Sequence, residues 1–390
     1  MRLPLLVGAI LVAALAAAGC GAPEEPPAVE PPHGYVEGAE ETAEAQSRLV
    51  VADAATGDVR VLDLITEEVV AVAHVAGVTG IATDGRHAYV TAADGAVHVV
   101  DSGAWTVDHG DHVHHYRAPI RAVGAVAGVG GPVTVHSDTA VAAVSSADGT
   151  VRLLDRTRLD AGAVTETATI TGPVAVPYAE HVLVSAGGVE VRTRQGAPVG
   201  RIDVPCEGLE GSAVTRRGVV FGCADGALLV TEDDGAFRGE KIPYPSPVDE
   251  GNRAREFHHR PGSAALAARA GESGVWSLDV SRRSWTHLPV GPVVAVTTAG
   301  DTGPLLTLTA DGVLHAHDPG SGRETARAAL LTAPVAGDGP TPAIHVDPSR
   351  AYVNDPTSGV IHEIDYADNL RVARTFDVGS RASHIVETGR

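Results

Sequence analysis

Alternating apolar and polar residues recur along the chain as one phrase: an apolar strand, a turn that contains glycine, and a second strand that ends in a polar residue. In four copies the turn reads Ala-Asp-Gly, at 93–95, 147–149, 224–226 and 310–312. Asp-Gly between alternating apolar residues predicts a β-hairpin, because glycine accepts the positive φ that a tight turn requires. Eight copies of the phrase are present, and they end at Asp63, Asp101, Asp155, Thr193, Thr231, Asp279, Asp318 and Asp365.

The copies follow one another at intervals of roughly 40 residues, which is the period of a β-propeller blade of four strands. Short apolar stretches such as 78–82 and 69–72 flank the hairpins and supply the inner and outer strands of a blade. The sequence therefore predicts an all-β protein with a single β-propeller domain over residues 48–390. Eight blades are expected, and a ring of six or seven repeats, or two stacked domains, is the alternative.

The two ends of the predicted propeller complement each other. The first hairpin begins near Leu49 with no room for an inner strand before it, whereas residues 383–390 resemble an inner strand with no hairpin after them. We expect the C-terminal strand to complete the first blade, which closes the ring and removes two exposed sheet edges.

Residues 1–19 have the pattern of an export signal rather than of a folded element. Arg2 precedes an apolar run that is too short to span a bilayer, and this run leads through small residues into Cys20. The arrangement resembles the bacterial lipobox, in which the cysteine is lipidated; an ordinary secretion signal is the alternative. Residues 20–47, rich in Pro and Glu, follow as an extended and disordered acidic tether that contains His33. The mature protein is therefore expected outside the cytoplasm, held at the membrane only by its lipid.

The charge balance argues against a nucleic-acid partner. With 29 Lys and Arg against 49 Asp and Glu, the formal net charge is −20, which disfavours nucleic-acid binding because phosphates need a cationic face.

The cysteine content is consistent with a protein that is exported from the cytoplasm. If Cys20 carries lipid, Cys206 and Cys223 remain as an even pair in an oxidising compartment, and we expect them to form a disulfide. A redox role or a thiolate metal site is the alternative for this pair.

Histidine is abundant, with 18 His beside four Phe and three Trp, and the longest interval between hairpins contains the histidine-rich segment 108–116. Its candidate metal ligands are His109, Asp111, His112, His114 and His115. In an extended segment His112 and His114 share a face, and a turn at Gly110 lets His109 join them. Imidazole with carboxylate suits Zn²⁺, with Cu²⁺ and Ni²⁺ as competitors. A solvated loop that binds metal adventitiously is the alternative.

Three further histidines lie at nearly the same distance before the ends of their blades: His136, His259 and His345. This offset places them on inner strands, which converge on the central channel of a propeller. Our hypothesis is that the loop histidines His109, His112 and His114 share one transferable Zn²⁺ with these channel-wall histidines. Hydrogen-bonded wall residues without a metal role are the alternative.

Four phrases of the sequence fit one family pattern: 108–116, Pro132–His136, Cys206–Leu209 and Phe221–Gly226. In these phrases the chain resembles the AztD-type zinc metallochaperones. The resemblance implies a propeller outside the cytoplasmic membrane that binds zinc and delivers it to the solute-binding protein of a zinc ABC transporter. It also implies a mobile N-terminal segment with metal ligands beside the zinc site, and here that segment offers His33 and several Glu.

Sequence patterns of common hydrolases and nucleotide-binding enzymes are missing. The sequence holds no Gly-x-Ser-x-Gly elbow, no Walker loop and no His-Glu-x-x-His pair. We therefore expect a monomeric protein that is not an enzyme and that releases zinc by ligand exchange from neutral imidazoles on a mobile loop. The alternatives are a metal-dependent propeller hydrolase or lactonase, and a surface scaffold whose histidines are incidental.

Overall fold

The computed structural model describes residues 35–109, 112–335, 337 and 339–390. The chain divides into the units Met1–Tyr35 and Val36–Arg390, and the second unit contains the elements described below. The predicted signal segment, Cys20, His33 and Asp111 lie outside the described residues. Within the described part of the chain, no helix has the length and apolar character needed to cross a membrane.

The second unit is built from antiparallel sheets, and eight of those in the described residues repeat one arrangement of three or four strands. In hydrogen-bonded order, the first three sheets contain β34 (His384–Thr388), β2 (Arg48–Ala52), β3 (Asp58–Asp63) and β4 (Val69–His74); β5 (Val78–Thr83), β6 (His87–Ala92), β7 (Val97–Asp101) and β10 (Arg121–Val126); and β11 (Val133–Ser137), β12 (Val141–Ser146), β13 (Thr150–Asp155) and β14 (Glu166–Thr171). The fourth, fifth and sixth sheets contain β15 (Ala175–Tyr178), β16 (His181–Ser185), β17 (Val189–Thr193) and β18 (Pro198–Ile202); β19 (Ser212–Thr215), β20 (Gly218–Cys223), β21 (Gly226–Asp233) and β22 (Ala236–Pro243); and β23 (Ala265–Arg269), β24 (Val275–Asp279) and β25 (Ser284–Leu288). The seventh and eighth contain β26 (Ala295–Thr298), β27 (Leu305–Leu308), β28 (Val313–His317) and β29 (Glu324–Ala329); and β30 (Ile344–Val346), β31 (Ala351–Asp355), β32 (Val360–Asp365) and β33 (Arg371–Asp377). A further sheet contains β1 (Glu40–Thr42), β9 (Val113–Arg117) and β8 (Ala104–Asp108). The helices of the described residues are the short α1 (Arg156–Asp160) and the 3₁₀ turn η1 (Glu250–Asn252).

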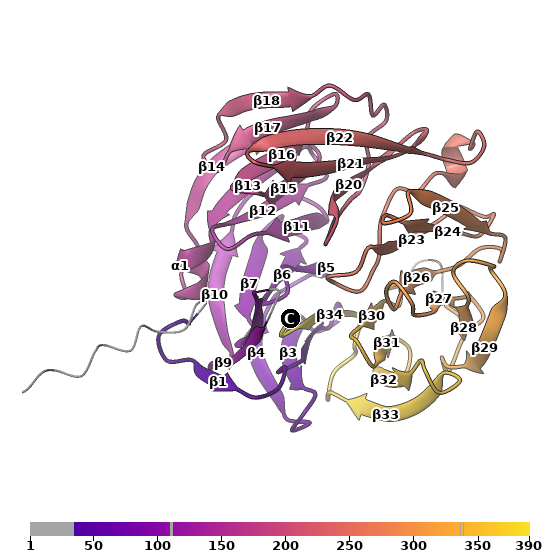
Figure 1. Ribbon diagram of the computed structural model, residues 1–390. Helices are drawn as coiled ribbons and strands as arrows, with labels where there is room; N and C mark the ends of the chain where they lie inside the picture. The colour runs from indigo at the N-terminus through magenta and orange to yellow at the C-terminus, as the bar shows by residue number, and fades with distance from the viewer. Residues whose placement is uncertain (1–34, 110–111, 336, 338) are drawn as a thin grey trace, which may run out of the picture. The chain divides into compact units, whose positions relative to one another are not determined.

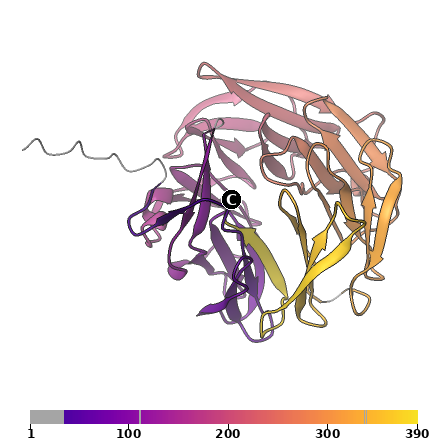
Figure 2. The same ribbon diagram turned by 60° about the horizontal axis from the view of Figure 1, so that its bottom comes forward.

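The eight sheets follow one another around the C-terminal strand β34, with β5, β11, β26 and β30 on the inside and β14, β18, β29 and β33 on the outside (Figure 1). Strand β34 pairs with β2, Val386 opposite Val50, so the last strand completes the first sheet. Figure 2 shows the same contact, with the yellow C-terminal strand beside the indigo strands of the first sheet. The predicted all-β propeller class is confirmed, while the number of blades and the closure of the ring stay predictions.

The core forms where neighbouring sheets pack against each other through small apolar side chains. Val50 and Val61 of the first sheet share one buried cluster with Val90 of the second. Each such side chain contributes about 1.5–3 kcal/mol when it is fully buried. At the hairpin turns, Gly95 and Gly149 adopt φ values of 83° and 84°, the positive φ on which the sequence prediction depends.

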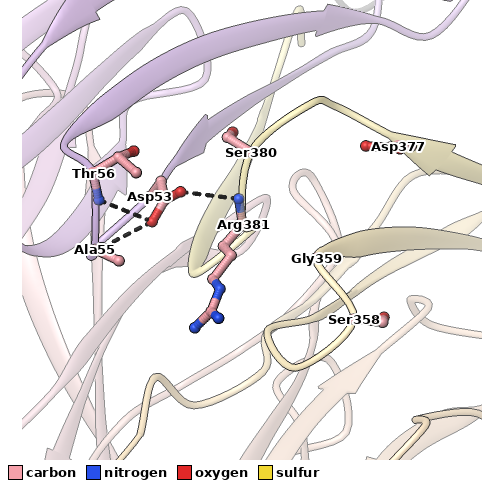
Figure 3. A pocket seen from close by; sticks show the side chains of 8 residues that line it. All are labelled: Asp53, Ala55, Thr56, Ser358, Gly359, Asp377, Ser380 and Arg381. Atoms are coloured by element: carbon pink, nitrogen blue, oxygen red, sulfur yellow. Dashed lines mark hydrogen bonds between the residues drawn. The ribbon is translucent and has the colours of Figure 1, made fainter.

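The junction between the last and the first sheet is fastened by Asp53, a buried residue at the end of β2. Its carboxylate accepts hydrogen bonds from the backbone N–H groups of Ala55 at 2.8 Å, Thr56 at 3.3 Å and Arg381 at 3.0 Å (Figure 3). Arg381 precedes β34, so one carboxylate holds the first hairpin turn and the final strand together. These residues line a pocket of about 530 Å³.

Part of the segment predicted to be a disordered tether is ordered. Residues Glu40–Thr42 form β1, which pairs with β9 so that Glu41 lies opposite Tyr116. The side chains of β1 are too polar to predict a strand, but the edge of the β8–β9 hairpin offers unpaired backbone groups that a polar segment can bind. The compact unit accordingly begins at Val36 rather than at residue 48.

Cys206 and Cys223 form the predicted disulfide, with their Cα atoms 5.0 Å apart. Cys223 is the last residue of β20, and Cys206 lies in the loop between β18 and β19. Both residues are buried. In this oxidised form the pair offers no thiolate to a metal ion.

Candidate metal centre

The β8–β9 hairpin carries the histidine-rich segment, and the alternation of the strand decides which of its side chains share a face. In the register of the hairpin, Thr106 lies opposite His115 and Val107 lies opposite His114. His114 therefore faces one side of the hairpin, and its neighbour His115 faces the other.

His109, His112 and His114 come together at the turn end of this hairpin. One ring nitrogen from each lies within 4.8 Å of the other two, His109 and His112 being exposed and His114 half-buried. The ring centroids are 4.8, 5.4 and 5.0 Å apart. A tetrahedral zinc ion with bonds of about 2.0 Å holds its nitrogen ligands about 3.3 Å apart, so shifts of roughly 1 Å bring these rings into coordinating positions. The three residues fit a zinc ion with an open fourth position.

Glu41 joins this cluster from a distant part of the chain. Its Oε1 lies 2.7 Å from Nδ1 of His114, across 73 residues of sequence. A carboxylate that accepts the Nδ1–H of a histidine leaves Nε2 as the free lone pair and fixes the orientation of the ring. Glu41 is not among the predicted ligands, because its position depends on the pairing of β1 with β9. The sequence carries only a weak signal for it, an acidic pair at 40–41 in a segment expected to be mobile.

Another predicted ligand from the same segment, His115, lies outside this group of described residues. Nδ1 of His115 lies 2.9 Å from Oγ1 of Thr106, which itself donates to the backbone carbonyl of Gly389 at 3.0 Å. His115 thus anchors the opposite face of the hairpin to the C-terminal end of the chain. Asp111 falls outside the described residues, and its place in the site stays a prediction.

The three channel-wall histidines line a separate central cavity of about 1230 Å³. His136 and His345 lie on the inner strands β11 and β30 as predicted, whereas His259 lies in the segment before β23 rather than on a strand. Each has a ring nitrogen hydrogen-bonded to the protein: His136 to Ser212 Oγ at 2.8 Å, His259 to the Val214 carbonyl at 3.0 Å, and His345 to the Ile385 carbonyl at 2.9 Å. Among the described residues, the metal-compatible group contains only His109, His112 and His114. The structure therefore does not bring the loop and channel histidines to one ion, and the channel set has the geometry of bonded wall residues.

Burial in the cavity disfavours the charged form of His136, His259 and His345. Burial lowers the pKa of His136 and His259 to about 4 and that of His345 to about 3. The guanidinium of Arg390 adds to the effect for His259 and His345. Burial also raises the pKa of Glu387 to about 7, against the opposing effect of Arg390, which pairs with it at 3.0 Å.

Comparison with known proteins finds similarity to a zinc chaperone. No protein-family model matches the chain. It is 26% identical over 367 residues to the zinc chaperone AztD of Citrobacter koseri, an alignment that covers 88% of this chain and 86% of that protein. The similarity agrees with the resemblance seen in the sequence.

Solved structures give the same picture of the fold. The crystal structure of Citrobacter koseri AztD matches with a TM-score of 0.74 at 23% identity, covering 88% of this chain and 98% of that chain. The structure of apo AztD from the same organism matches with a TM-score of 0.74 at 22% identity and the same coverage. At these identities the likeness of the solved structures establishes the fold.

Proposed function

We propose that this protein is an extracytoplasmic zinc chaperone that holds Zn²⁺ at His109, His112 and His114. The observation that carries the proposal is the convergence of three imidazole nitrogens within 4.8 Å of one another on an exposed hairpin. The similarity to a protein named as a zinc chaperone supports it, since a chaperone needs such a cargo site.

The chemistry of the cluster suits transfer rather than permanent retention. Three neutral nitrogen ligands bind zinc well, and the fourth position of a tetrahedral ion stays open to a ligand from an acceptor. His109 and His112 are exposed, so an acceptor can replace them one at a time. We infer that the acceptor is the solute-binding protein of a zinc ABC importer and that the chaperone acts as a monomer by ligand exchange.

The proposed location follows from the N-terminal sequence and the disulfide. Residues 1–19 would be removed as a signal, and Cys20 would carry the lipid that holds the protein at the membrane surface. The Cys206–Cys223 disulfide is supporting, because such bonds persist in oxidising compartments outside the cytoplasm.

The test is a zinc titration of the purified protein against a chromogenic chelator, followed by transfer to the purified acceptor. The variant His109→Ala/His112→Ala/His114→Ala should lose stoichiometric zinc and transfer none. The matched control His136→Gln/His345→Gln removes two channel-wall imidazoles and should bind and transfer zinc as the unmodified protein does. Unchanged zinc affinity in the triple variant would refute the assignment.

A further inference from the structure

Four planar groups are stacked in one column that ends at the proposed zinc cluster. The Cζ atom of Arg86 lies 3.7 Å from the ring centroid of Trp105. Trp105 stacks on Tyr116 with 5.3 Å between centroids, and Tyr116 stacks on His114 with 6.2 Å between centroids. Both stacked pairs have interplanar angles of 24°. The column therefore links a metal-binding ring to a guanidinium that does not touch the metal site.

The Arg86 end of the column is rigid. Arg86 is 2% exposed and holds both carboxylate oxygens of Asp101, through Nε at 3.0 Å and Nη2 at 2.9 Å. A second ion pair joins its Nη1 to Asp160 at 3.2 Å. A bidentate, buried pair of this kind fixes the plane of the guanidinium. Asp101 in turn accepts a hydrogen bond from the backbone N–H of Gly103, one residue before β8.

Trp105 and Tyr116 connect the fixed guanidinium of Arg86 to the β8–β9 hairpin. Trp105 of β8 and Tyr116 of β9 are directly opposite each other, and both are buried. Stacked aromatic pairs and a desolvated cation over an indole both stabilise their arrangement beyond the area that they bury. His114 is two residues from Tyr116 on the same face of β9, so its ring extends the stack.

We infer that Trp105 and Tyr116 are positioning residues for the proposed zinc site. They hold the ring of His114 in the plane that points one nitrogen at His109 and His112, and they take their own orientation from Arg86. The inference rests on the proposed function. It adds that zinc affinity depends on three residues that offer the metal no ligand atom.

The experiment replaces the indole and measures the metal site directly. Trp105→Leu should weaken Zn²⁺ binding by about tenfold, the lower end of the effect of outer-shell partners on metal affinity. It should also alter the visible absorption spectrum of Co²⁺ bound in place of zinc, because a freed His114 ring changes the ligand geometry. The conservative variant Trp105→Tyr keeps an aromatic plane and should restore both the affinity and the spectrum.

A matched control separates positioning from general destabilisation. Trp285 is 8% exposed against 6% for Trp105. It lies on β25, away from the β8–β9 hairpin, and is likewise packed among aromatic rings, those of Tyr244 and Trp276. Trp285→Leu should lower the melting temperature of the metal-free protein and leave the Co²⁺ spectrum unchanged.

The outcomes also distinguish this inference from the proposed function. Zinc binding that persists after replacement of His109, His112 and His114 overturns the proposed site. Zinc binding that requires these three residues, combined with unchanged affinity and an unchanged Co²⁺ spectrum in Trp105→Leu, overturns the positioning role alone. If Trp105→Leu does not fold, Tyr116→Leu tests the same column from the other strand, with the same expected spectral change.

Discussion

The Oε1 atom of Glu41 lies 2.7 Å from Nδ1 of His114, although 73 residues separate the two in sequence. This contact makes β1, a strand from the N-terminal segment, part of the proposed zinc site. Since the carboxylate accepts from Nδ1, it presents Nε2 of His114 to the metal.

We therefore expect Glu41→Gln to lower zinc affinity by about tenfold and to speed zinc release, because a neutral amide orients the imidazole less strongly than a carboxylate. Competition with a chelator measures the affinity, and stopped-flow mixing with excess chelator measures the release. Glu40→Gln is the control, since Glu40 pairs with Arg117 at 2.7 Å rather than with a histidine. Equal zinc affinity in the two variants would show that the Glu41 contact does not support the site.

Adjacent residues on β9 provide a second discriminating pair. His114→Ala removes a proposed ligand and should weaken zinc binding by more than the roughly tenfold effect of an outer-shell change. His115→Ala removes a ring on the opposite face, bonded to Thr106, and should leave zinc affinity within about twofold of the unmodified value. Calorimetric zinc titration of both variants is sufficient. A larger loss in His115→Ala than in His114→Ala would reverse the assignment of the two faces.

The features of the fold and the site that the sequence predicts are those set by local strand geometry. The repeated Asp-Gly hairpins predict the sheets, and the period-2 rule predicts the shared face of His112 and His114, because both depend on local backbone geometry. His115 is nevertheless among the predicted ligands, although the same rule puts it on the other face. The inner-strand offset likewise places His136 and His345 on the wall of the central cavity.

The remaining features depend on contacts that local pattern does not encode. Whether the hairpin meets the channel is decided by how whole elements pack, so the sequence did not exclude a site shared between His109 and His136. Glu41 belongs to a segment whose composition predicts disorder, and it becomes part of the site only through backbone pairing with β9. Trp105 and Tyr116 give no signal of their role, because aromatic residues at such positions ordinarily serve packing.

The lowered pKa values of His136, His259 and His345 predict a specific dependence of stability on pH. In the unfolded chain His136, His259 and His345 take up protons below about pH 6.5, whereas the folded protein takes them up only near pH 4 for the first two and pH 3 for the third. Acid therefore favours unfolding, by about 1.4 kcal/mol per pH unit for each proton. Glu387 opposes this, because its raised pKa of about 7 adds stability that is lost as the pH rises toward that value.

Three histidines outweigh one carboxyl, so the free energy of unfolding should fall as the pH is lowered from about 6.5 to about 4.5. Urea titrations at several pH values measure it. His345→Gln keeps a donor for the Ile385 carbonyl and removes one titrating group, so its profile should be less steep by about one proton. A profile that is flat over this range in the unmodified protein would contradict the neutral state of the buried rings.

The disulfide should stabilise the fold without contributing to zinc binding. Cys206 and Cys223 are 17 residues apart, and closing a loop of this size constrains the unfolded chain by about 3 kcal/mol. Cys206→Ser/Cys223→Ser should therefore lower the free energy of unfolding by about 3 kcal/mol. In urea titrations the unfolding midpoint should move to a lower concentration. Zinc affinity should stay unchanged, because the bond joins the β18–β19 loop to β20, whereas the zinc cluster lies on the β8–β9 hairpin. Reduction of the unmodified protein should reproduce the lower midpoint. A loss of zinc affinity with no loss of stability would instead assign the cysteines to the metal site.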